Sequence, residues 1–181
     1  MKTFEFSIIA SGLDPEADDF ADRFFRAGCD DATISFQKGH IIVDFAREAD
    51  SIVAAICSAI ECTEKAGAHV NRLEPDPLVS LSDIAARTGL SRAAITNYSK
   101  GDRADSFPSP VARVTSKTSL YSWAAVAAWL FQHKQLSREE AVEAEAVRVA
   151  NAAIESREPR LRETLRRSLK TYEAKLEKEA A

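Results

Sequence analysis

The sequence of 181 residues is poor in the residue types from which disulfide frameworks and metal sites are built. It contains three cysteines and three histidines. An odd number of cysteines argues against a disulfide framework, so Cys29, Cys57 and Cys62 are expected to be buried or half-buried thiols. The histidines are far apart in sequence and form no cluster, which excludes the common zinc-binding spacings.

Long apolar runs and catalytic motifs are also missing. No hydrophobic run is long enough to cross a bilayer, and Glu5 interrupts the apolar stretch that a signal peptide would need. There is no glycine-rich phosphate loop, nucleophile elbow or zinc-ligand spacing. We therefore expect a cytoplasmic protein that is not an enzyme, with no catalytic residue, no cofactor and no metal.

What is present is an ordinary globular composition with its charges segregated along the chain. The sequence is 45% hydrophobic and its net charge is −4. Residues 1–77 carry 7 basic and 15 acidic side chains, residues 78–136 carry 7 and 3, and residues 137–181 carry 10 of each. Because binding to phosphates depends on local potential, the middle segment is the candidate for nucleic-acid contact.

The first 75 residues alternate between strand and helix patterns. Three stretches have apolar residues at every second position (Phe4–Ile8, Ala32–Phe36, Ile41–Phe45), and a short fourth one spans Val70–Leu73. Helical spacing follows Asp14-Pro15, a predicted N-cap, and again follows Ser51. The order strand, helix, strand, strand, helix, strand predicts a ferredoxin-like α+β domain over residues 1–75.

Acidic residues gather around the first predicted helix of this domain, at Asp14, Glu16, Asp18, Asp19 and Asp22. A catalytic or metal-binding carboxylate cluster is one interpretation. A solvated helix face is favoured, because no histidine, cysteine or glycine loop accompanies the acids.

Two prolines in the stretch 74–77 mark a stiff boundary, after which "LSDIAARTGLSRAAITNYSK" begins at Leu81. Ser80 or Ser82 is expected to cap a first helix and Ser91 a second, with Gly89 in the turn between them. Ile84, Ile95 and Tyr98 are predicted to face inward. The pattern fits either a structural helical hairpin or a helix-turn-helix.

The outer face of the second helix carries side chains suited to base edges in the DNA major groove. Arginine pairs with guanine, asparagine with adenine, and an alanine methyl group contacts the thymine methyl group. We predict base contacts by the following residues: Arg92, Ala93, Thr96 and Asn97.

The next stretch, "FPSPVARVTSKTSLYSWAAVAAWL" from Phe107, predicts extended backbone, a β-hairpin of Val111–Val114 with Thr118–Tyr121, and a tryptophan-bearing helix capped by Ser122. With the two preceding helices, residues 78 to about 133 resemble the excisionase and AlpA-like branch of MerR-type winged helix-turn-helix proteins, which implies a DNA-binding domain over residues 78–136. That resemblance implies double-stranded DNA as partner. It also implies phosphate or wing contacts by Ser91, Lys100, Arg103, Arg113 and Lys117.

Residues 137–181 are predicted to be helical, with an interruption at Glu158-Pro159. Leu165, Leu169, Tyr172 and Leu176 recur at spacings of 4, 3 and 4, which forms a stripe on one helix face. The stripe is either a dimer or partner seam, or the buried side of a helix that packs on its own chain.

The sequence thus predicts an α+β protein with a winged helix-turn-helix and C-terminal helices, acting as a sequence-specific transcriptional regulator. We expect a homodimer and a local role, such as an autoregulating repressor or an antitoxin that binds a toxin through its N-terminal domain or C-terminal helices. The alternative is a protein-interaction adaptor whose helix-turn-helix no longer binds DNA, which would explain the overall acidity and Asp102 and Asp105.

Overall fold

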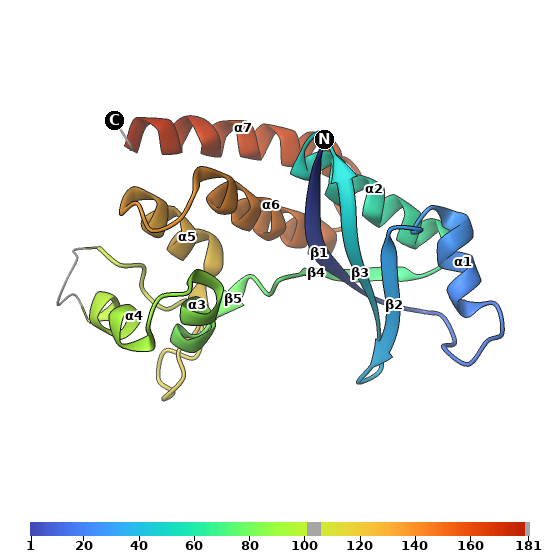
Figure 1. Cartoon of the computed structure of the whole chain (residues 1–181), viewed down its shortest axis with the longest axis horizontal. Coiled ribbons are helices and arrows are strands. Elements are labelled where there is room, and N and C mark those ends of the chain that lie inside the picture. Colours follow the sequence, from blue (N-terminus) through green and yellow to red (C-terminus); the bar gives the residue numbers. More distant parts are fainter. Residues whose placement is uncertain (101–105, 180–181) are drawn as a thin grey trace. The chain divides into compact units, whose positions relative to one another are not determined.

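The computed structural model describes residues 1–100 and 106–179 and is a mixed α+β fold (Figure 1). The chain forms two compact units, each assembled from two separate stretches of sequence. Unit 1 consists of residues 1–75 and 146–168, and unit 2 consists of residues 76–145 and 169–181. In the described part of the chain, no helix combines the length and apolar character that a membrane crossing requires.

A four-stranded antiparallel sheet forms the centre of unit 1. Its strands are β1 (Lys2–Ser11), β2 (Ala32–Gln37), β3 (His40–Ala49) and β4 (His69–Glu74). They lie in the order β2-β3-β1-β4, with Phe6 opposite Phe45 and Ile8 opposite Val43. The alternating residues of β1 and β3 are buried on one face, as the apolar pattern predicts.

The two helices between these strands are α1 (Phe20–Ala27) and α2 (Ile52–Lys65). Gly28 ends α1 in the left-handed conformation, and the Ser51 hydroxyl accepts a hydrogen bond from the backbone N–H of Ala54 at the start of α2. The cap at Ser51 confirms the helix start predicted after that residue, and the left-handed glycine is a common helix end.

The predicted start of α1 is wrong. The side chain of Asp14 accepts a hydrogen bond from the backbone N–H of Glu16, and its carbonyl accepts one from Ala17, so this stretch forms turns. Asp18 therefore lies outside the helix, and α1 begins only at Phe20. Aspartate side chains that bond their own backbone compete with helix formation, which explains the late start.

An asparagine closes the outer edge of the sheet at β4. Asn151 belongs to α6 (Arg138–Glu155), and its side-chain oxygen accepts from the backbone N–H of Leu73 at 2.7 Å. Its amide nitrogen donates to the Leu73 carbonyl at 3.0 Å. The side chain thus replaces a neighbouring strand at this position, which protects an edge that would otherwise be open to pairing.

Unit 2 contains small paired strands and short helices. Its elements are β5 (Leu78–Val79), α3 (Leu81–Thr88), α4 (Arg92–Ser99), β6 (Tyr121–Ser122) and α5 (Trp123–Gln132). β5 pairs antiparallel with β6, a pairing that the sequence did not suggest. Tyr98 and Phe107 pack on Trp129 with ring centres 5.1 and 5.0 Å away, which closes the core beside α5.

The hairpin predicted after Pro110 is only partly formed. Ala112 and Leu120 make a single antiparallel bridge, and Tyr121 pairs with β5 instead of continuing the hairpin. Residues 113–119 form a loop in which the hydroxyls of Ser116 and Ser119 donate to backbone carbonyls. The stretch lacks the Asn-Gly or Asp-Gly dipeptide that forms a tight two-residue hairpin turn. Its backbone carbonyls therefore accept hydrogen bonds from these serine side chains, and the strand pairing does not extend further.

The C-terminal helices are α6 and α7 (Leu161–Glu179), interrupted where the sequence has Glu158-Pro159. Each of them contributes to both units, because the division falls after Glu145 in α6 and after Ser168 in α7. Residues 137–181 are therefore shared between the two units.

Candidate nucleic-acid interface

The helix pair α3 and α4 is fixed by local hydrogen bonds at both helix starts. The Ser80 hydroxyl accepts from the backbone N–H of Asp83 at 3.3 Å, and the Asp83 carboxylate accepts from the backbone N–H of Ser80 at 2.8 Å. This capping box holds the pKa of Asp83 below its ordinary value, through the hydrogen bond from the Ser80 hydroxyl first of all. Ser91 caps α4 in the same way, by accepting from Ala94.

The turn between the helices depends on Gly89, which has a φ of 69°. This conformation lets α4 fold back so that Ile84 and Ile95 are fully buried. The burial of Ile95 determines which side of α4 faces outward. Its first turn, with Arg92 and Ala93, is exposed, whereas Thr96 and Asn97 are half-buried.

Two of the predicted base-contacting side chains already have hydrogen-bond partners within the protein. The Arg92 guanidinium donates to the Ser82 hydroxyl on α3, and the Thr96 hydroxyl donates to the Arg92 carbonyl at 2.8 Å. Arg92 is thus held at the start of α4 by a neutral, exposed partner that another hydrogen-bond acceptor can replace.

The 113–119 loop brings a second cation to the same place. Arg92 and Lys117 both line a small cleft of about 80 Å³, together with Ser80, Leu81, Thr118, Ser119 and Tyr121. Lys117 is exposed. The structure therefore gathers the start of α4 and the loop tip around one opening, although 25 positions separate the two cations in sequence.

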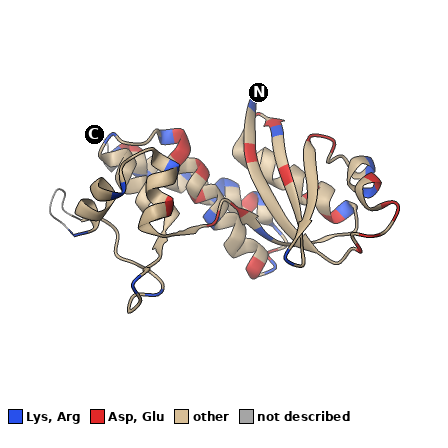
Figure 2. Cartoon of the chain, turned by 60° about the horizontal axis from the view of Figure 1, so that its bottom comes forward, with Lys and Arg blue, Asp and Glu red and all other residues tan. Residues whose placement is uncertain are grey.

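Acidic side chains are sparse along these elements. Residues 81–100 contain three basic residues and one acidic residue, the Asp83 of the capping box, and residues 106–136 contain three basic and none acidic. Figure 2 shows the contrast with the loop before α1, which is acidic. An anion that approaches this side of unit 2 meets cations from the helix pair and from the loop.

The remaining predicted phosphate contacts differ in position. Ser91 is the exposed N-cap of α4, and Lys100 is exposed at its C-terminal end. Arg113 is exposed at the beginning of the 113–119 loop. Arg103, with Asp102 and Asp105, lies outside the described residues.

The predicted dimer or partner stripe on α7 faces the interior of the chain. Leu165, Leu169 and Leu176 are buried, and Tyr172 is half-buried. These side chains are covered within a single copy of the protein, as expected for a helix that packs on its own chain.

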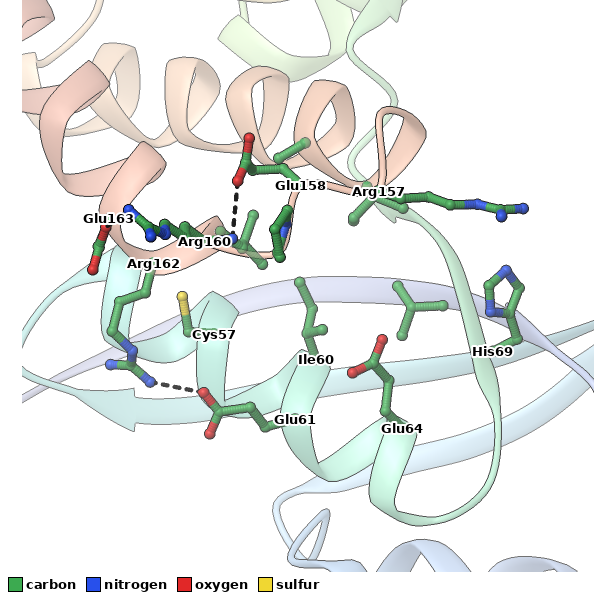
Figure 3. Close-up of a pocket in the computed structure, with 15 residues that line it drawn as sticks. Cys57, Ile60, Glu61, Glu64, His69, Arg157, Glu158, Arg160, Arg162 and Glu163 are labelled. Carbon is green, nitrogen blue, oxygen red and sulfur yellow. Dashed lines mark hydrogen bonds and ion pairs between the residues drawn. The ribbon is translucent and has the colours of Figure 1, made fainter.

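Unit 1 has a cleft of about 610 Å³ between α2 and the turn that joins α6 to α7 (Figure 3). Arg162 donates to the Glu61 carboxylate at 3.0 Å, and the Glu158 carboxylate accepts from the backbone N–H of Arg160. The lining of the cleft includes three arginines and four glutamates, so the cleft favours neither anions nor cations. Sequence spacing gave no signal for it, because its two sides lie about 100 positions apart.

Two of the acids around α1 form ion pairs along the helix. Asp19 and Asp22 pair with Arg23 and Arg26 on the exposed side of the helix. Within residues 1–100 and 106–179, no group of three metal-ligating side chains comes together. The interpretation as a solvated face accounts for these ion pairs.

No protein-family model, curated protein sequence or solved structure matches the chain. Its function has to be inferred from the chemistry of its own residues.

Proposed function

We propose that this protein is a sequence-specific DNA-binding regulator that places α4 in the major groove of double-stranded DNA. The observation that carries the proposal is the common cleft of Arg92 and Lys117, because it joins a base-contacting position to a phosphate-contacting one. A helix start that points into the groove, with a cationic loop beside it, satisfies both requirements of specific binding.

In the proposed complex, Arg92 exchanges Ser82 for the O6 and N7 atoms of a guanine. Asn97 pairs with adenine, and the methyl groups of Ala93 and Thr96 contact thymine. Ser91, Lys100, Arg113 and Lys117 lie along the DNA backbone, and the sequence assigns the same role to Arg103, outside the described residues. These contacts set the position of the helix without selecting a sequence.

We propose further that unit 2 is a winged helix-turn-helix of the MerR-like, excisionase type and that the 1–75 stretch is ferredoxin-like. The sheet order β2-β3-β1-β4 and the pairing of β5 with β6 support these assignments. In this proposal the protein is a cytoplasmic homodimer that acts as a local repressor or antitoxin. Because the stripe on α7 is buried, the dimer contact is expected on another surface.

The first test is selection of bound duplexes from a random library at near-physiological salt. A specific regulator is expected to enrich one motif, with a preference of about 10³-fold or more over random DNA. Inverted half-sites in the enriched motif would also support a symmetric dimer. Retention without any enriched motif would contradict the proposal.

Single substitutions then separate base contacts from phosphate contacts. Arg92→Ala or Asn97→Ala should cost ~1–3 kcal/mol of binding free energy and relax the base preference at one position. Lys117→Ala should weaken binding to all duplexes and lower the salt slope by about 1. The control is Arg26→Ala, which removes one exposed cation from α1 in unit 1. Equal losses for Lys117→Ala and this control would argue against a wing contact.

A second candidate is a protein-interaction adaptor that does not bind DNA. It is favoured by Val111, just before the 113–119 loop, and Val114, within it, whose exposed fractions are 59% and 63%. Exposed valines on a loop are suited to an apolar partner surface. The candidates separate in the selection experiment. The adaptor enriches no duplex, and its partner binding is weakened by Val114→Ser but not by Asn97→Ala.

A further inference from the structure

Two cysteines that are far apart in sequence meet in the core of unit 1. The sulfur atoms of Cys29 and Cys62 lie 2.6 Å apart, which leaves no room for another atom between them. Both side chains are buried, with exposed fractions of 3% and 6%. The third cysteine, Cys57, lines the cleft of unit 1 and has no part in this contact.

The fold holds both sulfur atoms in place by backbone geometry. Gly28 ends α1 in the left-handed conformation, and the backbone N–H of Cys29 then donates to the Phe24 carbonyl at 3.0 Å. Cys62 lies in the last turns of α2, on the buried face of that helix. The pair therefore joins the end of one helix to the end of another.

A buried cation lies next to the pair. Arg47 occupies an inward position of β3, and its guanidinium donates to the Cys62 sulfur at 3.6 Å. The same group makes two bonds to the Asp31 carboxylate, at 2.8 and 2.6 Å, and one to the Gly28 carbonyl at 2.8 Å. The guanidinium is thus fixed on three sides, with its positive charge directed at one of the two sulfurs.

The surroundings of the two thiols make them unequal. The hydrogen bond from Cys29 and the charge of Arg47 lower the pKa of Cys62 to about 7, against the effect of burial. The pKa of Cys29 is raised, chiefly by its hydrogen bond to Cys62 and by burial. Cys62, which faces the Arg47 guanidinium, is therefore the more readily ionised thiol and Cys29 its hydrogen-bonding partner, an arrangement found in reactive cysteine pairs.

We propose that Cys29 and Cys62 form a reversible disulfide within the chain, with hydrogen peroxide as the oxidant and Cys62 as the attacking sulfur. Peroxide is small enough to reach a buried site. The polar side of the cluster opens to solvent through Asp31, whose side chain is 30% exposed.

The chemistry requires two displacements. The Cys62 thiolate attacks one peroxide oxygen, the S–O bond forms as the O–O bond breaks, and the departing hydroxide takes a proton and becomes water. The sulfur of Cys29 then attacks the sulfenic acid of Cys62, the S–S bond forms as the S–O bond breaks, and the thiol proton leaves with the second oxygen as water. Two thiols lose two electrons and two protons, and one peroxide becomes two waters.

The test counts thiols in the full-length protein. The reduced protein is treated with hydrogen peroxide, the reaction is stopped with catalase, and the denatured chain is labelled with a polyethylene-glycol maleimide. Three adducts are expected before oxidation and one afterwards, with the intact mass lower by two hydrogen atoms and three adducts restored by dithiothreitol. Three adducts after oxidation would overturn the proposal. So would a disulfide that includes Cys57 or the mass of a sulfinic acid in place of a disulfide.

Matched variants assign the roles of the three cysteines. The Cys57→Ala variant should carry two adducts before oxidation and none afterwards, because the reacting pair is intact. Cys29→Ala should accumulate a Cys62 sulfenic acid that dimedone captures, whereas Cys62→Ala should keep both remaining thiols. Dimedone capture at Cys29 in Cys62→Ala, at the rate seen for Cys62, would contradict the assignment of the attacking sulfur.

Arg47 acts as a positioning residue, and the pH dependence of the reaction tests its role. Lysine lacks the forked guanidinium group with which Arg47 reaches both Asp31 and Cys62. In Arg47→Lys the rate of thiol loss should therefore reach half its maximum at a higher pH than in the unchanged protein. An unchanged pH profile would remove Arg47 from the proposal.

Discussion

Arg47 is a cation at a core-facing position of β3, and Asp31 is the carboxylate that neutralises it. Burial of an unpaired charge is costly, so the ion pair is a requirement of this fold and also the support of the thiol pair. The hydrogen bonds from Arg47 hold the pKa of Asp31 below its ordinary value.

The first prediction concerns Asp31→Asn and pH. A carboxyl group whose pKa is lowered in the folded state contributes stability above its unfolded pKa of about 3.9 and loses it as the pH falls through the folded value. Asp31→Asn should therefore lower the free energy of unfolding by roughly 1–3 kcal/mol at pH 7, and the difference should vanish in acid. Urea unfolding at several pH values measures this difference.

The neighbouring residue provides the control. Asp30→Asn removes the same charge from an exposed position. It should have little effect at any pH. A pH-independent loss in Asp31→Asn would mean that its packing matters and its charge does not.

A residue-scale pattern in the sequence could have revealed this cluster. The alternation of Ile41, Val43 and Phe45 continues inward through Arg47 to Ala49. An arginine in such a register must find an acid. The identity of that acid, and the meeting of two cysteines 33 positions apart, depend on how α1 and α2 pack, which alternation does not encode.

At the scale of elements, the local sequence was sufficient to predict helix ends wherever backbone groups form hydrogen bonds with nearby side chains or a glycine ends the helix. The caps at Ser51, Ser91 and Ser122 and the left-handed turns at Gly28 and Gly89 follow from residues within three positions. The pairing of β5 with β6 could not be predicted in this way. Two-residue strands have no periodicity, and the paired residues are 42 and 44 positions apart.

The second prediction belongs to the edge of the sheet. Asn151→Ala removes both side-chain bonds to the buried Leu73 and leaves its N–H and carbonyl without these partners. The free energy of unfolding should fall by roughly 2–4 kcal/mol, because each orphaned backbone group costs about 1–3 kcal/mol. Asn71→Ala, at an exposed position of the same strand, is the control and should have a much smaller effect.

Hydrogen exchange gives a second measurement of the same prediction. The amide of Leu73 should exchange faster in Asn151→Ala than in the control, while amides of α4 should keep their rates. Unchanged protection at Leu73 would show that another group covers this edge.

At the scale of the whole molecule, the two tryptophans offer a way to observe the units separately. Trp123 and Trp129 both belong to unit 2, so their fluorescence reports on that unit, whereas far-ultraviolet circular dichroism reports on both. A perturbation confined to unit 1 can therefore be distinguished from one that affects the whole chain.

The third prediction uses this difference. Oxidation of Cys29 and Cys62 closes a loop between positions 33 apart, which should stabilise unit 1 by about 3–4 kcal/mol through the entropy of the unfolded chain. The urea transition seen by circular dichroism should shift to higher denaturant. Cys29→Ala treated with peroxide is the control and should show no such shift. Unchanged transitions in the oxidised protein would contradict the prediction.

The division of α6 and α7 between the units has a consequence for synthesis on the ribosome. The strands of unit 1 are made first, but Asn151 and the rest of the 146–168 stretch come after the 70 residues from 76 to 145. At translation rates of about 5–20 residues per second, the nascent sheet waits roughly 4–14 s with its β4 edge unsealed. An open edge of this kind is available for pairing with a strand of another nascent chain throughout that interval.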